Sequence, residues 1–333
     1  MPHVSSTIPA APLLRVENLS VRFETETGPM DVVRSVSFQM KEGETFCLVG
    51  ESGCGKSMTA FSLLGLVPEP GRIVAGNVTL DGKELSGLPE SALNAVRGKQ
   101  IGMIFQEPMT ALNPVLRVGE QVAEPLMHHL RLSRKDALAE AENLFRQVGI
   151  PAAERRLRDF PHQMSGGMRQ RVMIAMALAC RPRLLLADEP TTALDVTIQG
   201  QILALLRELS ASRGMGLLLI THDLGVVAEM ADTVGVMYAG SIVEKASVNS
   251  IFAAPLHPYT RGLMRSVPLP GTPPSQRLDA IPGSVPSPGA LPEGCPFRPR
   301  CDMAHERCLT APPLVRLGEG AAAREVCCWL ASG

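Results

Sequence analysis

The feature that most constrains this chain is a glycine-rich loop with the sequence Gly50-Glu51-Ser52-Gly53-Cys54-Gly55-Lys56-Ser57. The apolar run Thr45–Val49 precedes it and predicts a buried strand, whereas Lys56–Leu66 predicts a helix. A G-x-x-x-x-G-K-S loop between a strand and a helix is typical of a nucleotide phosphate site. We therefore expect an α/β fold whose nucleotide site includes residues 50–57.

The chemistry of phosphate binding explains the residue types in this loop. Glycines allow successive backbone N–H groups to turn inward around an anion, at which the positive end of the helix dipole also points. Lys56 adds a positive charge against the terminal phosphates, and the Ser57 hydroxyl is a ligand for Mg²⁺. The loop therefore predicts a nucleotide bound together with Mg²⁺.

Two carboxylates follow a second apolar run, Leu184–Ala187, which also predicts a buried strand. A carboxylate at the C-terminal end of a neighbouring parallel strand can hold Mg²⁺, directly or through water, and we assign this role to Asp188. Glu189 is one residue further on and is the expected general base for an attacking water. An isolated Asp-Glu pair could equally be a solvated strand end, but the phosphate loop favours the catalytic interpretation.

A second candidate anion site is the sequence Ser165-Gly166-Gly167-Met168-Arg169-Gln170. Ser165 suits the N-cap of a helix, and the two glycines leave backbone N–H groups open to an anion. By itself this sequence would indicate an ordinary helix cap. The presence of the first phosphate loop in the same chain favours a role in phosphate binding.

The pattern along the chain predicts the organisation of the fold. Leu13–Phe23 and Val33–Met40 alternate apolar and polar residues, which predicts two antiparallel strands joined by a turn at Glu24–Met30. A further buried strand is expected at Gly216–Ile220. Helices are expected at Met168–Cys180, Ile198–Ser210, Leu126–Leu130 and Ala137–Val148. Strands that alternate with helices predict a largely parallel, covered sheet, with a helical insertion at about residues 107–170.

The two ends of the chain differ in composition from the middle. Residues 1–12 are expected to be a flexible tail, and residues 13–265 the main domain. Residues 266–333 are rich in proline and hold five of the eight cysteines, which predicts a loop-rich C-terminal extension. Clustered cysteines suggest a metal or redox site more than disulfides if the chain stays in a reducing cytosol.

Charge and composition exclude several classes of protein. The net charge of −1 and the 4% aromatic content argue against a nucleic-acid binder. No apolar run approaches the roughly 20 residues that a membrane-spanning helix needs. The sequence shows no signal peptide, so we expect a chain that stays in the cytosol and docks onto a membrane protein if it works at a membrane.

The order of motifs resembles the ATPase subunit of an ABC transporter over about residues 13–265. The matching motifs are Gly50–Ser57, Gln106, Ser165–Gln170, Leu184–Glu189, Ala193-Leu194-Asp195 and His222. The resemblance implies that two ATPase domains dimerise head to tail, with each ATP between Gly50–Ser57 of one domain and Ser165–Gln170 of the other.

The same resemblance implies roles for four single residues. Gln106 would contact Mg²⁺ and the attacking water, Asp195 would cross the dimer interface, and His222 would contact the terminal phosphate. Phe23 is the candidate for stacking on adenine. The alternative for Phe23 is a half-buried aromatic residue of a strand.

The residues within and around these motifs are similar to the dipeptide/oligopeptide branch of these importers over nearly the whole chain. The segments that carry this similarity are Phe105-Gln106-Glu107-Pro108, Leu112-Asn113-Pro114, Met164–Gln170, Thr191–Gln199, Ala254–Thr260 and Gly294–Cys301. This branch implies a peripheral ATPase on the cytoplasmic face of the inner membrane. Its partners would be two permeases, an identical or related second ATPase, and an external peptide-binding protein.

Three alternatives to peptide import stay open. Related machines carry nickel, opines or glutathione-like solutes. A soluble ABC ATPase acting on DNA or ribosomes would be expected to have a long coiled-coil insertion or two ATPase domains, and the sequence shows neither. The cysteine-rich extension could also act as a redox or iron sensor alongside transport.

The cysteines of the extension have a specific implication within this branch. A set like Cys295, Cys301, Cys308 and Cys328 is associated there with a [4Fe–4S] cluster, which four thiolates usually hold. We expect Arg298, Arg300 and Arg307 to favour the thiolate form. The chain departs from the branch at Trp329, where a histidine often stands, and Cys327 is a rival ligand. Reduced thiols in a small packed extension are the alternative.

Overall fold

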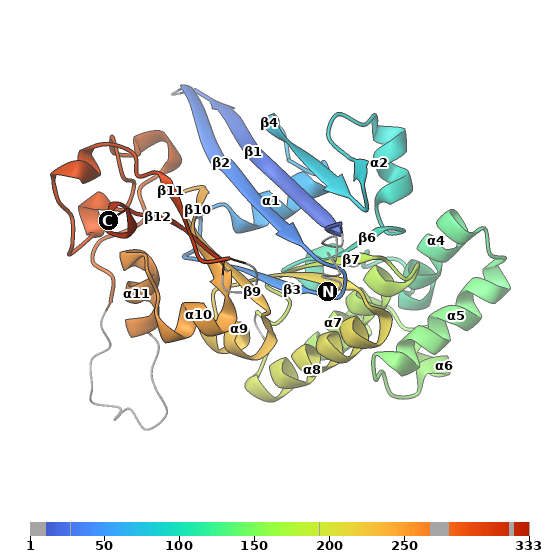
Figure 1. Cartoon of the computed structure of the whole chain (residues 1–333). Coiled ribbons are helices and arrows are strands. Elements are labelled where there is room, and N and C mark those ends of the chain that lie inside the picture. The colour runs from blue at the N-terminus through green and yellow to red at the C-terminus, as the bar shows by residue number, and fades with distance from the viewer. Residues whose placement is uncertain (1–10, 27, 193, 267–279, 320–322, 333) are drawn as a thin grey trace, which may run out of the picture.

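The structure is a computed structural model that describes residues 11–26, 28–192, 194–266, 280–319 and 323–332. Most of the predicted tail, residues 1–12, lies outside these ranges. The α/β class is confirmed, since an antiparallel sheet and a mixed sheet share the chain with many helices (Figure 1). Within the described part of the chain, no helix combines the length and the apolar character needed to cross a bilayer.

The antiparallel sheet has the strand order β2-β1-β4-β5. It consists of β1 (Leu14–Thr25), β2 (Gly28–Met40), β4 (Gly71–Leu80) and β5 (Lys83–Glu84). The predicted pair of strands is confirmed, but its turn is shorter than expected because Thr25 pairs with Gly28. The Thr25 hydroxyl donates to the Gly28 carbonyl at 2.7 Å, so the hairpin stays paired to its end.

Five parallel strands form the centre of the second sheet, in the order β9-β3-β8-β7-β6. They are β3 (Thr45–Val49), β6 (Ile101–Ile104), β7 (Leu184–Asp188), β8 (Gly216–Thr221) and β9 (Thr233–Tyr238). Alternate residues enter two different cores. Leu184 and Leu186 pack toward the antiparallel sheet, whereas Leu185 and Ala187 pack toward the helices of the other face. Because both faces of this sheet are packed against other elements, the residues of these strands are apolar in succession rather than alternately.

Helices follow most of the parallel strands, and several more lie within residues 108–178 after β6. The helices that flank the parallel strands are α1 (Lys56–Leu63), α2 (Glu90–Val96), α7 (Gly166–Leu178), α8 (Val196–Arg213) and α9 (Leu224–Met230). Between β6 and α7 lie α3 (Pro108–Ala111), α4 (Val118–Leu130), α5 (Arg134–Gln147) and α6 (Ala153–Arg156). In Figure 1, α4, α5 and α6 project on the side opposite the C-terminal extension. The regular elements described in this insertion are helical, as the sequence predicts.

The C-terminal extension is less separate than the sequence predicts. After β10 (Ser241–Ser247), α10 (Val248–Ala253) and α11 (Pro258–Arg265), the chain returns to form β11 (Leu314–Leu317) and β12 (Arg324–Cys327). Strand β12 pairs antiparallel with β10, so the order β11-β12-β10-β9 continues the main sheet. The rest of the described extension is loop-rich with short 3₁₀ turns, as expected. In addition to these loops, the extension contributes the two strands β11 and β12 to the core sheet.

Candidate nucleotide site

The glycine-rich loop leaves the end of β3 and enters α1 in a conformation that only glycine can adopt. Gly55 has a φ of +103°, and a Cβ atom there would lie 2.7 Å from the Val32 carbonyl oxygen. A Cβ atom on Gly50 would lie 2.2 Å from the Met237 carbonyl oxygen. Both positions exclude a side chain because backbone atoms on two neighbouring strands approach the loop too closely.

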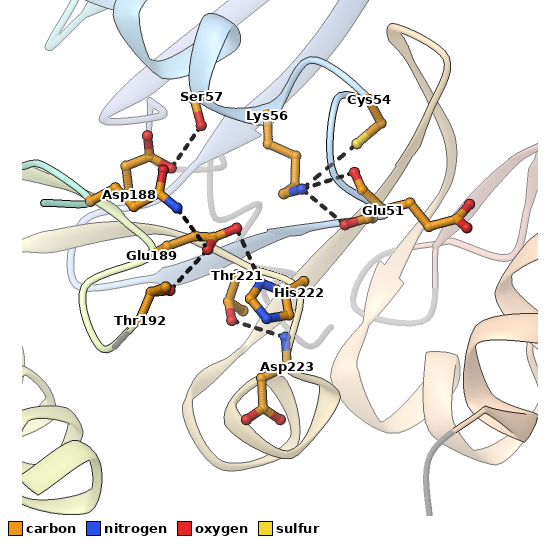
Figure 2. Close-up of polar contacts among 12 residues, drawn as sticks. Glu51, Cys54, Lys56, Ser57, Asp188, Glu189, Thr192, Thr221, His222 and Asp223 are labelled. Atoms are coloured by element: carbon orange, nitrogen blue, oxygen red, sulfur yellow. Dashed lines mark hydrogen bonds and ion pairs between the residues drawn. The ribbon is translucent and has the colours of Figure 1, made fainter. Parts of the chain in front are cut away.

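Lys56 is the first residue of α1, and its side chain is enclosed by the loop (Figure 2). Its residue exposure is 5%, and its Nζ donates to the carbonyl oxygens of Gly50 at 2.9 Å and Glu51 at 3.1 Å. The ammonium group is thus held at the centre of the loop by backbone acceptors. This places a positive charge where an anion surrounded by the loop would lie.

Ser57 and Asp188, the two residues expected to hold Mg²⁺ with Gln106, meet across the start of α1 and the end of β7. The Ser57 hydroxyl donates to Asp188 Oδ1 at 2.9 Å (Figure 2). Burial raises the pKa of Asp188, and the hydrogen bond from Ser57 opposes this shift. A hydroxyl and a carboxylate oxygen side by side are the kind of ligands that Mg²⁺ prefers, so the residues present fit the ion.

Glu189 occupies a strained position directly after β7. Its φ of +44° lies in the left-handed region, which is costly for a residue with a side chain. Its Oε2 accepts from Thr192 Oγ1 at 2.9 Å and from Gln106 Nε2 at 3.3 Å, and its Oε1 lies 3.1 Å from His222 Nδ1. Such strain persists when the surrounding contacts fix the residue, and here three side chains fix the carboxylate.

The charge state of Glu189 follows from these contacts. Burial alone would raise the pKa of the carboxyl group, but hydrogen bonds from His222 and Thr192, with the positive charges of His222 and Lys56, outweigh it. The pKa of Glu189 therefore lies below its ordinary value, and the group is ionised near neutral pH. An ionised carboxylate is the form that can accept a proton from water.

The structure brings together Gln106, Glu189 and His222, which are far apart in the sequence. Gln106 follows β6, Glu189 follows β7 and His222 follows β8, so all three lie at the carboxyl ends of neighbouring parallel strands. This edge of an open α/β sheet is where ligands bind in such folds. Thr192, which positions Glu189, was missed by the sequence reasoning because a threonine after a strand carries no distinctive signal.

The other predicted nucleotide residues are not brought to the loop within one chain. Ser165 caps α7, where its side chain accepts from Met168 N at 3.4 Å, and Asp195 caps α8, where it accepts from Ile198 N at 2.9 Å. Gln170 is buried and donates to the Pro190 carbonyl at 2.6 Å. Among the described residues, no hydrogen bond joins Ser165–Gln170 to Gly50–Ser57. Their contact with nucleotide stays a prediction.

Phe23 lies in β1, opposite Gly71 of β4. A Cβ atom on Gly71 would come within 2.5 Å of the Phe23 ring, so the half-buried ring packs over the backbone of the neighbouring strand. This contact is what a half-buried strand aromatic would make. Stacking on adenine stays a prediction.

Comparison with known proteins identifies the family. The ABC transporter family matches residues 33–192, and the family "Oligopeptide/dipeptide transporter, C-terminal region" matches residues 243–308. The chain is 50% identical over 303 residues to the oligopeptide transport ATP-binding protein AppD of Bacillus subtilis, covering 90% of this chain and 92% of AppD. It is also 50% identical to OppD of Salmonella typhimurium over 312 residues, covering 94% of this chain and 92% of OppD. The chain belongs to the ABC transporter ATP-binding proteins, in the oligopeptide/dipeptide branch.

Solved structures support the same family. A dimeric post-hydrolysis state of the ATP-binding cassette MJ0796, bound to ADP and Pi, aligns with a TM-score of 0.64 and 28% identity. The alignment covers 71% of this ABC ATPase and 98% of that chain. The protein cbiO1 from Clostridium perfringens, part of the ABC transporter complex cbiONQ, aligns with a TM-score of 0.61 and 26% identity, and the alignment covers 73% of this chain and 91% of that chain.

The four predicted cluster cysteines of this ABC ATPase surround one small, mainly apolar cavity. Its lining includes Cys295, Cys301, Cys308 and Cys328. In the described parts of the chain, however, no group of three or more His, Cys, Asp or Glu side chains is arranged to hold a metal ion. The rival Cys327 is directed elsewhere, since its thiol donates to the Ile242 carbonyl at 3.7 Å.

The expectation that neighbouring arginines favour thiolates is wrong for these cysteines. Burial is the main cause that raises the pKa of the Cys295, Cys301 and Cys328 thiols. Two of the three arginines have other partners, because Arg300 pairs with Glu51 and Arg307 lies 4.5 Å from the centre of the Trp329 ring. Arg298 acts on Cys295 through its backbone N–H rather than its side chain, and this effect is smaller than that of burial. Trp329, at the position where the branch often has a histidine, thus packs against Arg307.

Proposed function

We propose that this chain hydrolyses ATP to drive the import of oligopeptides through partner membrane permeases. The names of its relatives support peptide transport, and half of the aligned residues are identical across about nine-tenths of each chain. The observation that carries the proposal is the position of the Glu189 carboxylate, which Gln106, Thr192 and His222 fix next to the paired Ser57 and Asp188 of the phosphate site.

In the proposed mechanism, each residue has a defined task. The backbone of Gly50–Ser57 binds the phosphates and Lys56 neutralises their charge. Ser57, Asp188 and Gln106 would hold Mg²⁺, which would supply further charge neutralisation on the phosphate oxygens. Glu189 accepts the proton of the attacking water, and His222 orients Glu189 and contacts the terminal phosphate.

The second half of each nucleotide site would come from another subunit. Ser165, Gly166, Gly167 and Gln170 would contact the ATP bound by the loop of the facing subunit, and Asp195 would cross the interface. The open N-terminus of α7 supports this, because two glycines there leave backbone N–H groups accessible to an anion. Phe23 would stack on adenine.

The proposed assembly sits on the cytoplasmic face of the membrane as a peripheral complex. It comprises two permeases, this ATPase, a second identical or related ATPase and an external peptide-binding protein. Mild-detergent purification from the native cell, followed by mass spectrometry, tests it. Recovery of two multi-span permeases supports import, and the genes beside theirs would separate peptides from nickel, opine or glutathione-like cargo. Recovery of ribosomal or DNA-repair proteins without permeases would contradict it.

We further propose that Cys295, Cys301, Cys308 and Cys328 hold a [4Fe–4S] cluster. Their shared cavity and the thiolate chemistry of such clusters support this, although the sulfur atoms would have to approach one another and lose their protons. The test is iron and acid-labile sulfide content after anaerobic purification. A chain without either would leave four reduced thiols as the correct interpretation.

A further inference from the structure

An arginine of the C-terminal extension, Arg300, contacts the phosphate loop. Arg300 donates from Nη1 to Glu51 Oε2 at 2.7 Å and from Nη2 to Glu51 Oε1 at 2.9 Å. This is a two-point ion pair between the second residue of the loop and a residue of the extension. The Arg300 side chain is only 4% exposed and that of Glu51 is 31% exposed, so the pair is largely shielded from water.

Arg300 is held rigidly for this contact. Its Nε donates to the Pro282 carbonyl at 2.8 Å, and its Nη2 also approaches the Gly283 carbonyl at 3.3 Å. The guanidinium group lies 5.8 Å from the centre of the Tyr238 ring. A planar guanidinium fixed by backbone carbonyls and an aromatic face is pre-organised to bind a carboxylate at two points.

Glu51 is anchored from three sides. Its carboxylate binds Arg300, its backbone N–H donates to the Tyr259 hydroxyl at 2.9 Å, and its carbonyl oxygen accepts from Lys56 Nζ at 3.1 Å. Figure 2 shows the Glu51 side chain pointing away from Lys56. The contact with Arg300 therefore fixes a residue that itself positions the lysine of the phosphate loop.

The charge of Glu51 makes this contact important for nucleotide binding. A carboxylate in a loop that binds phosphates would repel them unless a cation compensated it. Arg300 is the cation that the described residues place directly on Glu51.

We propose that Arg300 is a positioning residue of the ATP site, which neutralises the Glu51 carboxylate and holds it away from the bound phosphates. The proposal rests on the proposed role of Gly50–Ser57 in ATP binding. If the proposal holds, the extension, which carries Arg300 beside Cys301, contributes to the affinity of the site for nucleotide. A purely structural clamp between the extension and the core is the competing explanation.

The test is the dissociation constant of Mg-ATP for the purified full-length chain, measured by calorimetry for R300Q, E51Q and the double variant E51Q/R300Q. We expect R300Q to bind about tenfold more weakly, because it leaves Glu51 unpaired beside the phosphates. The double variant should bind within about threefold of the wild type, because it carries neither charge. A structural clamp would not be rescued, so the double variant would bind as weakly as R300Q or more weakly.

Two outcomes would overturn the proposal. The first is that R300Q binds Mg-ATP within about twofold of the wild type, and the second is that the double variant does not recover affinity. If R300Q fails to fold, the comparison of the wild type with E51Q/R300Q decides, since the proposal expects the chain without either charge to bind Mg-ATP within about threefold of the wild type.

Two further variants serve as a control for the loss of an ion pair and as a test of the ATP site itself. R265Q is the matched control, because Arg265 forms an exposed ion pair with Asp302 of the same extension at 3.5 Å and should bind Mg-ATP normally. K56A tests the underlying ATP site. Normal binding by K56A would contradict the proposed function, whereas loss of binding by K56A with normal binding by R300Q would contradict only the role of Arg300.

Discussion

Replacing Glu189 by glutamine should separate ATP binding from ATP hydrolysis. The amide has nearly the same size as the carboxylate and can still accept one hydrogen bond, from Thr192 at 2.9 Å in the native structure. It cannot accept the proton of water. Loss of a positioned general base lowers rates by about 10²–10⁴-fold, which corresponds to about 3–5 kcal/mol of activation free energy. Because Lys56 and Ser57 are unchanged, the affinity for Mg-ATP should stay near that of the wild type.

The assay is single-turnover release of phosphate from Mg-ATP, with size-exclusion chromatography in parallel. E189Q should accumulate as an ATP-bound dimer, since each proposed nucleotide site includes residues of two subunits and the unhydrolysed ATP would keep them together. E229Q is a suitable control, because Glu229 is an exposed glutamate paired with Arg207 at 3.5 Å, away from the loop. Turnover of E189Q within about threefold of the wild type would show that Glu189 is not the base.

Three other perturbations test the site and the extension. K56A should lose most of its affinity for Mg-ATP in calorimetry, because nothing else replaces the ammonium group inside the loop; unchanged affinity would place the phosphates elsewhere. R324L leaves the fully buried Glu244 carboxylate without its cation, and should lower the free energy of unfolding in urea by about 3–5 kcal/mol. R316L, at an exposed ion pair, is the control and should cost less than about 1 kcal/mol. C295S should remove most of the iron from anaerobically purified chain, and equal iron in both proteins would exclude Cys295 as a ligand.

The phosphate loop and its flanking elements could be predicted from sequence because the relevant forces are local. Thr45–Val49 is apolar at every position except its first, and the glycines that follow are required by backbone contacts, so the sequence itself reports the strand, the loop and the helix. The strand β6, Ile101–Ile104, gave no comparable signal. Four residues are too few to show a period, and its strand character comes from pairing with β7.

The candidate site could be predicted only in part for a different reason. Asp188 and Glu189 follow an apolar run directly, so their place at a strand end could be inferred from the sequence. Gln106 and His222 follow other strands, and nothing local shows that those strands are neighbours of β7. Their convergence on Glu189 depends on the strand order β8-β7-β6, which the sequence analysis did not predict. The family resemblance implied roles for both residues, and their contacts with Glu189 at 3.3 and 3.1 Å follow from that order.

The extension shows where sequence neighbours mislead. Arg300 stands beside Cys301 in the sequence, which suggested a cation that stabilises thiolates. In the folded chain its guanidinium group is instead committed to Glu51, and a second ion pair, between Arg324 and the buried Glu244, fixes β12 to β10. If the extension detached, the partly exposed Glu51 and the fully buried Glu244 would each lose the cation that now pairs with them. Detachment would therefore cost free energy at the phosphate loop itself, which is why the extension is better understood as part of the ATPase core than as an independent module.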